Sequence, residues 1–306
     1  MKKESLGNLM RIARKLVPYS SAAYRFLYGV YIRVNAVSRL MPKSASDMDV
    51  QIHAVDHCNL NCRGCDAFAP LVNNCYADIE VIKNDLQRLS ELTNGEIGTL
   101  TVSGGEPLQN HMLPEILDAA RMSFPGQKLK VITNGILLEK APDEFWKSCK
   151  KNDATIALTL YPIAIDVKKI NDIAASYGVR LVYQDDTDIR AKTLYSSPLD
   201  PLGKQDTRVN YKLCFMANKN IVLENGRMYT CPTIAHIKYI NEAFHQNFAV
   251  SESDYIDIYK AESFKEISGF LRKPMPFCRY CDKKRRVSGL QWEKSKGDIT
   301  EWIYTP

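Results

Sequence analysis

The chain has 306 residues, of which 45% are apolar, so it is long enough for one large α/β domain with appendages and is not a disordered protein. The net charge of +6 is concentrated at one end, because residues 1–43 hold nine Lys or Arg and one acid. The rest of the chain holds the other 32 of 41 basic and 34 of 35 acidic residues. This nearly neutral body excludes the basic surface that a nucleic-acid-binding protein needs.

Two amphipathic helices are predicted in the basic segment 1–43. Apolar residues recur every three or four positions at 4–17 and again at about 20–41, and Pro18 and Pro42 end the two patterns. Basic amphipathic helices can lie in a membrane interface, whereas apolar helical stripes more often pack on protein. Both alternatives stay open: packing on the barrel or on a partner, and peripheral contact with a membrane surface.

The start of the chain does not have the pattern of a secretory signal. Arg11, Arg14 and Lys15 interrupt any early apolar core, and the apolar run at 26–32 is too short to span a bilayer. Nine cysteines in such a chain are better read as metal ligands than as a disulfide framework. We therefore expect a cytoplasmic protein, with peripheral contact at the inner membrane face as the one alternative.

Between residues 50 and 184, segments typical of strands alternate with segments typical of helices. Asp78 is placed to cap the first helix, and Cys149 shares an apolar helix face with Phe145 and Trp146, so we expect a buried core thiol. The alternation predicts a parallel sheet with right-handed crossovers, in which the loops that follow the strands share one face. Five strands are predicted, with no sixth identified, at 50–56, 97–103, 129–133, 155–161 and 179–183.

Beyond residue 184 the pattern changes. Residues 185–212 are polar and show little periodicity, which predicts a long connection without regular structure. The dipeptide Asn225-Gly226 is a strong signal for a β-hairpin. The other elements predicted here are the hairpin strands at 220–224 and 227–231 and helical stretches around 235–246 and 257–271.

Three cysteines, Cys58, Cys62 and Cys65, lie within eight residues directly after the first predicted strand. Thiolates select soft metals, chiefly zinc, copper(I) and iron–sulfur clusters. Three cysteines on one short loop can bind three irons of a cubane cluster and leave the fourth iron open. A structural zinc site would need a fourth ligand, and the nearest spare cysteine, Cys75, follows an irregular stretch.

This cysteine spacing resembles the signature of the radical S-adenosylmethionine (SAM) superfamily. Gly104-Gly105-Glu106, after the second strand, resembles the GGE motif of that family, and Thr133-Asn134 follows the next strand. The family often has an aromatic residue just before the third cysteine, where this chain has Gly64. The resemblance covers residues 50–183 and implies an α/β fold, a partial (β/α) barrel of five or six parallel strands.

The resemblance also implies the cofactors. Cys58, Cys62 and Cys65 would hold a catalytic [4Fe-4S] cluster whose open iron binds the amino and carboxylate groups of SAM. A reductant such as flavodoxin or ferredoxin would supply the electron that cleaves SAM, and the resulting 5′-deoxyadenosyl radical would take hydrogen from the substrate. The family's cofactor-binding positions correspond here to Gly104, Gly105, Glu106, Thr133 and Asn134.

A second set of cysteines, Cys214, Cys231, Cys278 and Cys281, spans the predicted hairpin and the tail. This layout resembles the twitch domain, a short relative of the SPASM domain, which implies an auxiliary [4Fe-4S] cluster with all four irons ligated. Such a cluster would serve electron transfer. Hairpin cysteines followed by a C-x-x-C pair also make zinc sites, so zinc remains the alternative.

Three regions are therefore expected: a basic amphipathic helical extension at 1–43, a radical SAM partial barrel at 50–184, and a linker with a twitch-like domain of a small hairpin plus helices at 185–306. Cys75 is a candidate donor of a proton or hydrogen atom, although a single thiol is more often a small buried apolar side chain. Asp56 and His57, just before Cys58, are expected to support the site and not to act as catalytic acids.

The favoured function is hydrogen abstraction from a polar small molecule, such as a sugar or cyclitol, that ends in oxidation. Two enzymatic alternatives are isomerisation or epimerisation without net oxidation, and radical modification of a peptide. A non-enzymatic alternative is an iron–sulfur or zinc protein that serves binding.

Overall fold

The computed structural model describes residues 44–184 and 193–304, together with isolated positions and short stretches between 21 and 34. The first predicted N-terminal helix, 4–17, lies outside the described residues. The second lies partly within them, and most of its described positions are helical. One of these, Tyr31, accepts a hydrogen bond of 3.0 Å from the Lys219 ammonium group.

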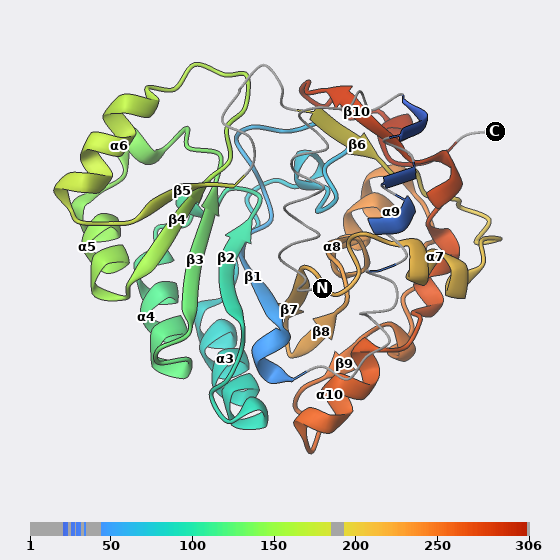
Figure 1. Cartoon of the computed structure of the whole chain (residues 1–306), viewed down its shortest axis with the longest axis horizontal. Coiled ribbons are helices and arrows are strands. Elements are labelled where there is room, and N and C mark those ends of the chain that lie inside the picture. The colour runs from blue at the N-terminus through green and yellow to red at the C-terminus, as the bar shows by residue number, and fades with distance from the viewer. Residues whose placement is uncertain are drawn as a thin grey trace.

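The fold is built on an open sheet of eight strands in the order β5-β4-β3-β2-β1-β7-β8-β9 (Figure 1). Strands β1 to β5 and β7 run parallel, and β8 and β9 add an antiparallel edge. This confirms the predicted α/β partial barrel. The strands are β1 Asp49–Val55, β2 Thr99–Gly104, β3 Lys128–Thr133, β4 Ala154–Leu158, β5 Leu181–Tyr183, β7 Ile221–Glu224, β8 Arg227–Tyr229 and β9 Ile256–Asp257.

The sixth parallel strand, which the sequence did not reveal, is β7. It pairs with β1 in the register Val50↔Ile221 and Gln51↔Val222. The strand was predicted only as one arm of a hairpin with β8, because the turn at Asn225-Gly226 signals that pairing and nothing local signals the other. The sheet therefore continues past residue 184, where the sequence placed the end of the barrel.

Helices α3 to α6 connect successive parallel strands and pack along one face of the sheet (Figure 1). The predicted cap of α3 is confirmed, because the Asp78 carboxylate accepts hydrogen bonds from the amides of Glu80 and Val81. The helices are α3 Ile79–Thr93, α4 Leu113–Ser123, α5 Asp143–Lys151, α6 Val167–Ser176, α7 Thr207–Leu213, α8 Pro232–His236, α9 Lys238–Phe244 and α10 Phe264–Leu271.

The prediction of a long connection without regular structure at 185–212 was wrong in part. Its described residues contain strand β6 (Thr193–Ser196), which pairs antiparallel with β10 (Val287–Gln291), and helix α7. Helix α7 is capped by Asp206, whose carboxylate accepts from the amides of Arg208 and Val209. Elements this short carry too few residues to show a clear periodicity.

Two large apolar clusters hold the described fold together, beside a small third one around Tyr211. The larger lies between the parallel sheet and helices α3 to α6, and it includes Cys149, which is fully buried as predicted. The second joins the C-terminal elements to the cysteine loop, where Phe68 packs edge-on against Trp302 with ring centroids 6.3 Å apart. Burying a large apolar side chain contributes about 1.5–3 kcal/mol, so this second core stabilises the loop. In the described residues, no helix is long and apolar enough to cross a membrane.

Candidate active site

A cavity of about 200 Å³ opens at the carboxyl ends of the parallel strands. Residues at or just after the ends of β1, β2, β3 and β4 all line it, as expected for a barrel of this type. Seven of the predicted site residues lie in its wall: Cys58, Cys62, Cys65, Gly104, Gly105, Thr133 and Asn134. The structure thus brings three loops together that are far apart in the sequence.

The cysteine loop is shaped by two residues with left-handed backbone, Asn61 at φ 54° and Gly64 at φ 62°. Glycine tolerates this region freely and asparagine does so better than most residues. Burial raises the pKa of Cys58, and it raises the pKa of Cys65 to about 12. The thiols are therefore protonated without a metal, and metal binding must release their protons.

Two tryptophans from the C-terminal segment cover the loop. The indole N–H of Trp292 donates to Cys62 Sγ at 3.1 Å, and that of Trp302 donates to the carbonyl of Cys65 at 2.9 Å. The backbone amide of Arg63 also donates to the Glu293 carbonyl at 3.0 Å. No sequence pattern predicts these contacts, because nothing local relates a tryptophan near the end of the chain to a loop 230 residues earlier.

The two glycines of the GGE motif have a steric reason. A Cβ atom on Gly104 would lie 1.9 Å from the carbonyl oxygen of Val55, and one on Gly105 would lie 1.9 Å from that of His57. The end of β2 therefore presses directly against the chain that leads into Cys58. Both glycines also line the cavity, where no side chain of their own separates the backbone from a ligand.

Glu106 lies behind the cavity and is fully buried. Its carboxylate accepts hydrogen bonds from Thr133 Oγ1 at 2.7 Å and from the Asn134 amide at 2.8 Å, and burial raises its pKa to about 7. The Asn134 side chain in turn donates to Asn59 Oδ1 at 2.8 Å, next to Cys58. In this arrangement Glu106 fixes the turn after β3 and, through Asn134, the cysteine loop.

Cys75 does not line the cavity that holds the three loop cysteines. It borders a separate cavity of about 240 Å³, and its thiol donates weakly to Asp56 Oδ2 at 3.7 Å. Its backbone amide donates to His57 Nδ1 at 3.0 Å. Asp56 and His57 thus hold the chain around the loop, in line with the supporting role expected of them.

The four remaining predicted ligands gather between α7, α8 and the 3₁₀ turn Pro276–Tyr280. Burial raises the pKa of Cys231 and of Cys278, and the charges of the neighbouring thiols raise both further. Burial alone would lower the pKa of Lys283, but Cys214, Cys281 and Cys231 raise it overall. The structure therefore places Lys283 as a cation beside this second cysteine set.

The spacing of the ligand atoms bears on the choice between zinc and a cluster. Across the part of the chain that the structure describes, only His53, Asp56 and His236 place three ligand atoms within 4.8 Å of one another. Tetrahedral zinc thiolate geometry needs sulfur atoms about 3.8 Å apart, since each Zn–S bond is about 2.3 Å. A cubane cluster takes one cysteine at each iron and so needs a wider set of sulfur atoms than a zinc ion does.

One polar atom in the cavity wall is left without a hydrogen-bond partner that a bound ligand could provide. Ser103 Oγ is buried and has no hydrogen-bond partner in the described structure. Buried polar groups are nearly always hydrogen-bonded, so a polar ligand in the cavity would satisfy it. The donor set as a whole, with three thiols, a free hydroxyl and two bare glycine backbones, fits an iron–sulfur cluster with a polar ligand beside it.

Comparison with known families agrees with this site. Residues 52–180 match the model of the Radical SAM superfamily. The matched segment runs from β1 to just before β5 and contains the three loop cysteines, the GGE motif and the Thr133-Asn134 turn. The match implies SAM and a [4Fe-4S] cluster as cofactors.

Solved structures that are similar to this chain include three proteins. The crystal structure of SuiB from Streptococcus suis is 18% identical, with a TM-score of 0.36; the match covers 59% of this chain and 42% of SuiB. BtrN in complex with AdoMet (SAM) and 2-DOIA is 15% identical, with a TM-score of 0.48 and coverage of 86% and 100%. Native anSMEcpe with bound AdoMet is 14% identical, with a TM-score of 0.47 and coverage of 76% and 82%.

Proposed function

We propose that this protein is a radical SAM enzyme that reductively cleaves SAM at a [4Fe-4S] cluster held by Cys58, Cys62 and Cys65. The observation that carries the proposal is the shared cavity: all three thiols face it together with the Gly104-Gly105 backbone and the Thr133-Asn134 turn. When bound, the reduced cluster and SAM would supply a 5′-deoxyadenosyl radical that abstracts hydrogen from a substrate.

The protein's own residues position the cofactors and keep water away from them. Trp292 and Trp302 cover the cysteine loop, and the buried Glu106 fixes the turn that carries Asn134. The Ser103 hydroxyl offers an unused hydrogen bond to a ligand in the cavity. Exclusion of solvent strengthens each of these polar contacts and protects a radical from side reactions.

We further propose that Cys214, Cys231, Cys278 and Cys281 hold an auxiliary [4Fe-4S] cluster in a twitch-like domain. Support comes from their gathering in one place and from the buried cation Lys283 beside them. Pro232, which directly follows Cys231, lines the cavity that holds the three loop cysteines. An electron acceptor held by these cysteines would therefore lie near the substrate.

The substrate class that the cavity favours is a polar small molecule, and the favoured outcome is its oxidation. Apart from the cysteines, the wall presents hydrogen-bonding side chains that suit hydroxyl or amino groups: Gln51, Ser103, Thr159, Tyr161 and Asn220. Loss of one hydrogen atom to the 5′-deoxyadenosyl radical, one electron to the auxiliary cluster and one proton to solvent balances a two-electron oxidation. If the enzyme instead isomerises its substrate or modifies a peptide, analysis of the reaction products would show a product other than the oxidised small molecule.

The test is whether SAM binds to the cluster of the loop cysteines. The full chain, reconstituted with iron and sulfide and reduced, should show an electron paramagnetic resonance signal that changes when SAM is added. A variant with Cys58, Cys62 and Cys65 all replaced by Ala should lose this change but keep the signal of the auxiliary cluster. An unchanged wild-type spectrum with SAM would instead support an iron–sulfur protein that serves binding.

A further inference from the structure

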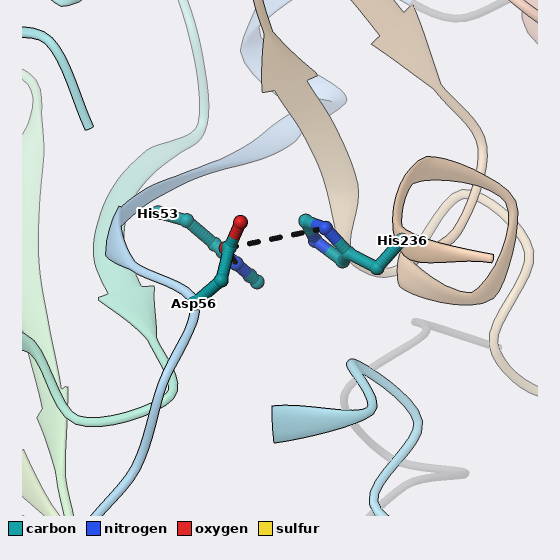
Figure 2. A group of neighbouring side chains, drawn as sticks. All are labelled: His53, Asp56 and His236. Atoms are coloured by element: carbon teal, nitrogen blue, oxygen red, sulfur yellow. Dashed lines mark hydrogen bonds and ion pairs between the residues drawn. The ribbon is translucent and has the colours of Figure 1, made fainter. Parts of the chain in front are cut away.

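A second group of metal-binding side chains lies outside the cysteine-lined cavity. His53 comes from β1, Asp56 from the turn after it, and His236 from the end of α8, and Asp56 and His236 point toward each other (Figure 2). Asp56 Oδ1 lies 2.7 Å from His53 Nδ1 and 4.0 Å from His236 Nδ1. All three side chains are buried, with His236 at 0% exposure.

We propose that His53, Asp56 and His236 bind one divalent first-row metal ion, such as Mn²⁺ or Zn²⁺. Two imidazoles and one carboxylate are a nitrogen and oxygen donor set that suits these ions and does not suit an iron–sulfur cluster. The site would be separate from both cysteine sets and would need no thiolate.

The state of His236 points to a missing ligand. Both of its ring nitrogens are buried and have no hydrogen-bond partner within the described residues. Burial lowers the pKa of His236 well below its ordinary value, so the ring is neutral and has a free lone pair. A buried neutral imidazole with neither nitrogen satisfied is rare in folded proteins, and a metal ion would satisfy it.

The charges around the ring favour a cation. Asp56 Oδ1 lies 2.7 Å from His53 Nδ1, and Asp56 Oδ2 accepts a hydrogen bond from the Tyr239 hydroxyl. A second carboxylate, Glu224, places Oε2 3.6 Å from His236 Nδ1. Glu224 also pairs with a lysine, since its Oε1 lies 2.7 Å from Lys238 Nζ. A divalent ion between the rings and Asp56 would balance the remaining negative charge.

Binding requires a small rearrangement. The rings of His53 and His236 are stacked, with centroids 4.2 Å apart and planes inclined by 17°, so their in-plane lone pairs do not yet converge. His236 can turn because no hydrogen bond holds either nitrogen. His53 is held through Nε2 by the Gln51 amide at 3.0 Å, which can donate or accept depending on its orientation.

An ion can reach the site from one side. His53 and Asp56 line the cavity of about 240 Å³ that also borders Cys75, Glu224 and Lys238. Asp56 lies two residues before Cys58, and His236 lies five residues after Cys231. An ion held by both would tie together the two segments that carry the catalytic and auxiliary cysteines, and so fix the distance between the two sets.

The test uses the full chain with its clusters reconstituted, dialysed to equilibrium against Mn²⁺ or, separately, against Zn²⁺ at micromolar concentration. Bound metal, iron and sulfide are then measured. Wild type should bind one equivalent of at least one of the two ions without loss of iron. His236→Gln and Asp56→Asn should each weaken that binding at least tenfold. The matched control is His111→Gln, because His111 is exposed, and this variant should bind like wild type.

Two results would overturn the proposal. One is a wild type that binds no equivalent of either ion, which would leave water and a buried polar network as the explanation of the cluster of side chains. The other is equal binding by wild type, Asp56→Asn and His236→Gln. If His236→Gln fails to fold, as judged by circular dichroism and iron content, the wild-type stoichiometry and Asp56→Asn still decide the matter.

Discussion

The contact between Trp292 and Cys62 is a single hydrogen bond with a measurable consequence. An N–H group aimed at a cysteine sulfur of an iron–sulfur cluster stabilises the more negative, reduced form and so raises the reduction potential. The donor lies far along the chain from Cys62, and the loop itself has Gly64 just before Cys65. The C-terminal segment thus supplies a hydrogen-bond donor to a cysteine of the loop.

Replacing Trp292 by Phe keeps an aromatic cover but removes the donor. We expect the midpoint potential of the catalytic cluster to fall by roughly 40 mV, because a neutral hydrogen bond contributes about 1 kcal/mol and 59 mV corresponds to 1.36 kcal/mol for one electron. A redox titration followed by electron paramagnetic resonance measures this. Trp302→Phe is the control, since its indole donates to a carbonyl and not to sulfur. Equal potentials in wild type and Trp292→Phe would contradict the assignment.

The buried Glu106 predicts a pH dependence of stability. Its pKa is raised from 4.5 to about 7 by burial, so the folded state holds the proton more tightly than the unfolded state does. This contribution is fully present below pH 4.5 and is lost as the pH rises through 7. At 1.36 kcal/mol per pKa unit it amounts to about 3 kcal/mol.

Urea unfolding of the metal-free, reduced protein at pH 5 and pH 8 tests this. Glu106→Gln cannot ionise, so its free energy of unfolding should fall less over this range than that of wild type. Glu115→Gln, on an exposed face of α4, should follow wild type. The idea fails if Glu106→Gln and wild type lose the same free energy between the two pH values.

At this scale the sequence predicted which loops meet at the cysteine-lined cavity. The seven predicted residues that line the cavity share it because strand ends of a parallel sheet meet at one edge. The sequence could not predict the roles of Trp292 and His236, since their partners come from segments with no local relation to them. The separate cavity that Cys75 borders is likewise a product of how the loop after Cys65 folds back toward α9.

At the scale of elements, the close contact between the end of β2 and the chain after β1 sets the shape of the site. That contact exists only because residues 104 and 105 are glycines. Gly269, in helix α10, is the opposite case, because an added Cβ there would meet nothing within 4 Å. Gly105 and Gly269 therefore make a matched pair of positions for testing the contact between β2 and the chain after β1.

Gly105→Ala should destabilise the protein by about 3 kcal/mol or more, since its Cβ would overlap the His57 carbonyl and the backbone must shift. Gly269→Ala should instead stabilise it by up to about 1 kcal/mol, because alanine is the better helix former. Chemical denaturation measures both, and the iron content after reconstitution should fall only for Gly105→Ala. Equal stability of the two variants would show that the contact is not needed.

The elements also show where sequence patterns succeed and fail. The long helices were predicted because apolar residues repeat over several turns and a cap such as Asp78 marks the start. The parallel pairing of β7 with β1 was not, because register across the chain is fixed by tertiary packing. Helix α7 and strand β10 were missed because they are short.

At the scale of the whole molecule, the two cysteine sets would carry separate tasks. Replacing Cys278 and Cys281 by Ala should remove about four of about eight irons per chain, because each [4Fe-4S] cluster holds four. The variant should still form 5′-deoxyadenosine but should no longer yield oxidised substrate. The ratio of the two products measures this once the substrate is found. Undiminished oxidised product would discard the role as electron acceptor and favour isomerisation.

The central claim is that the loop cysteines make SAM cleavage possible, and the release of 5′-deoxyadenosine tests it most directly. The reconstituted full chain is incubated anaerobically with SAM and dithionite, and the nucleoside is quantified by chromatography. Wild type and the Cys278→Ala/Cys281→Ala variant should both release it, whereas replacing any one of Cys58, Cys62 and Cys65 by Ala should abolish release. Cleavage that persists in the variant lacking all three loop cysteines would contradict the assignment of the site.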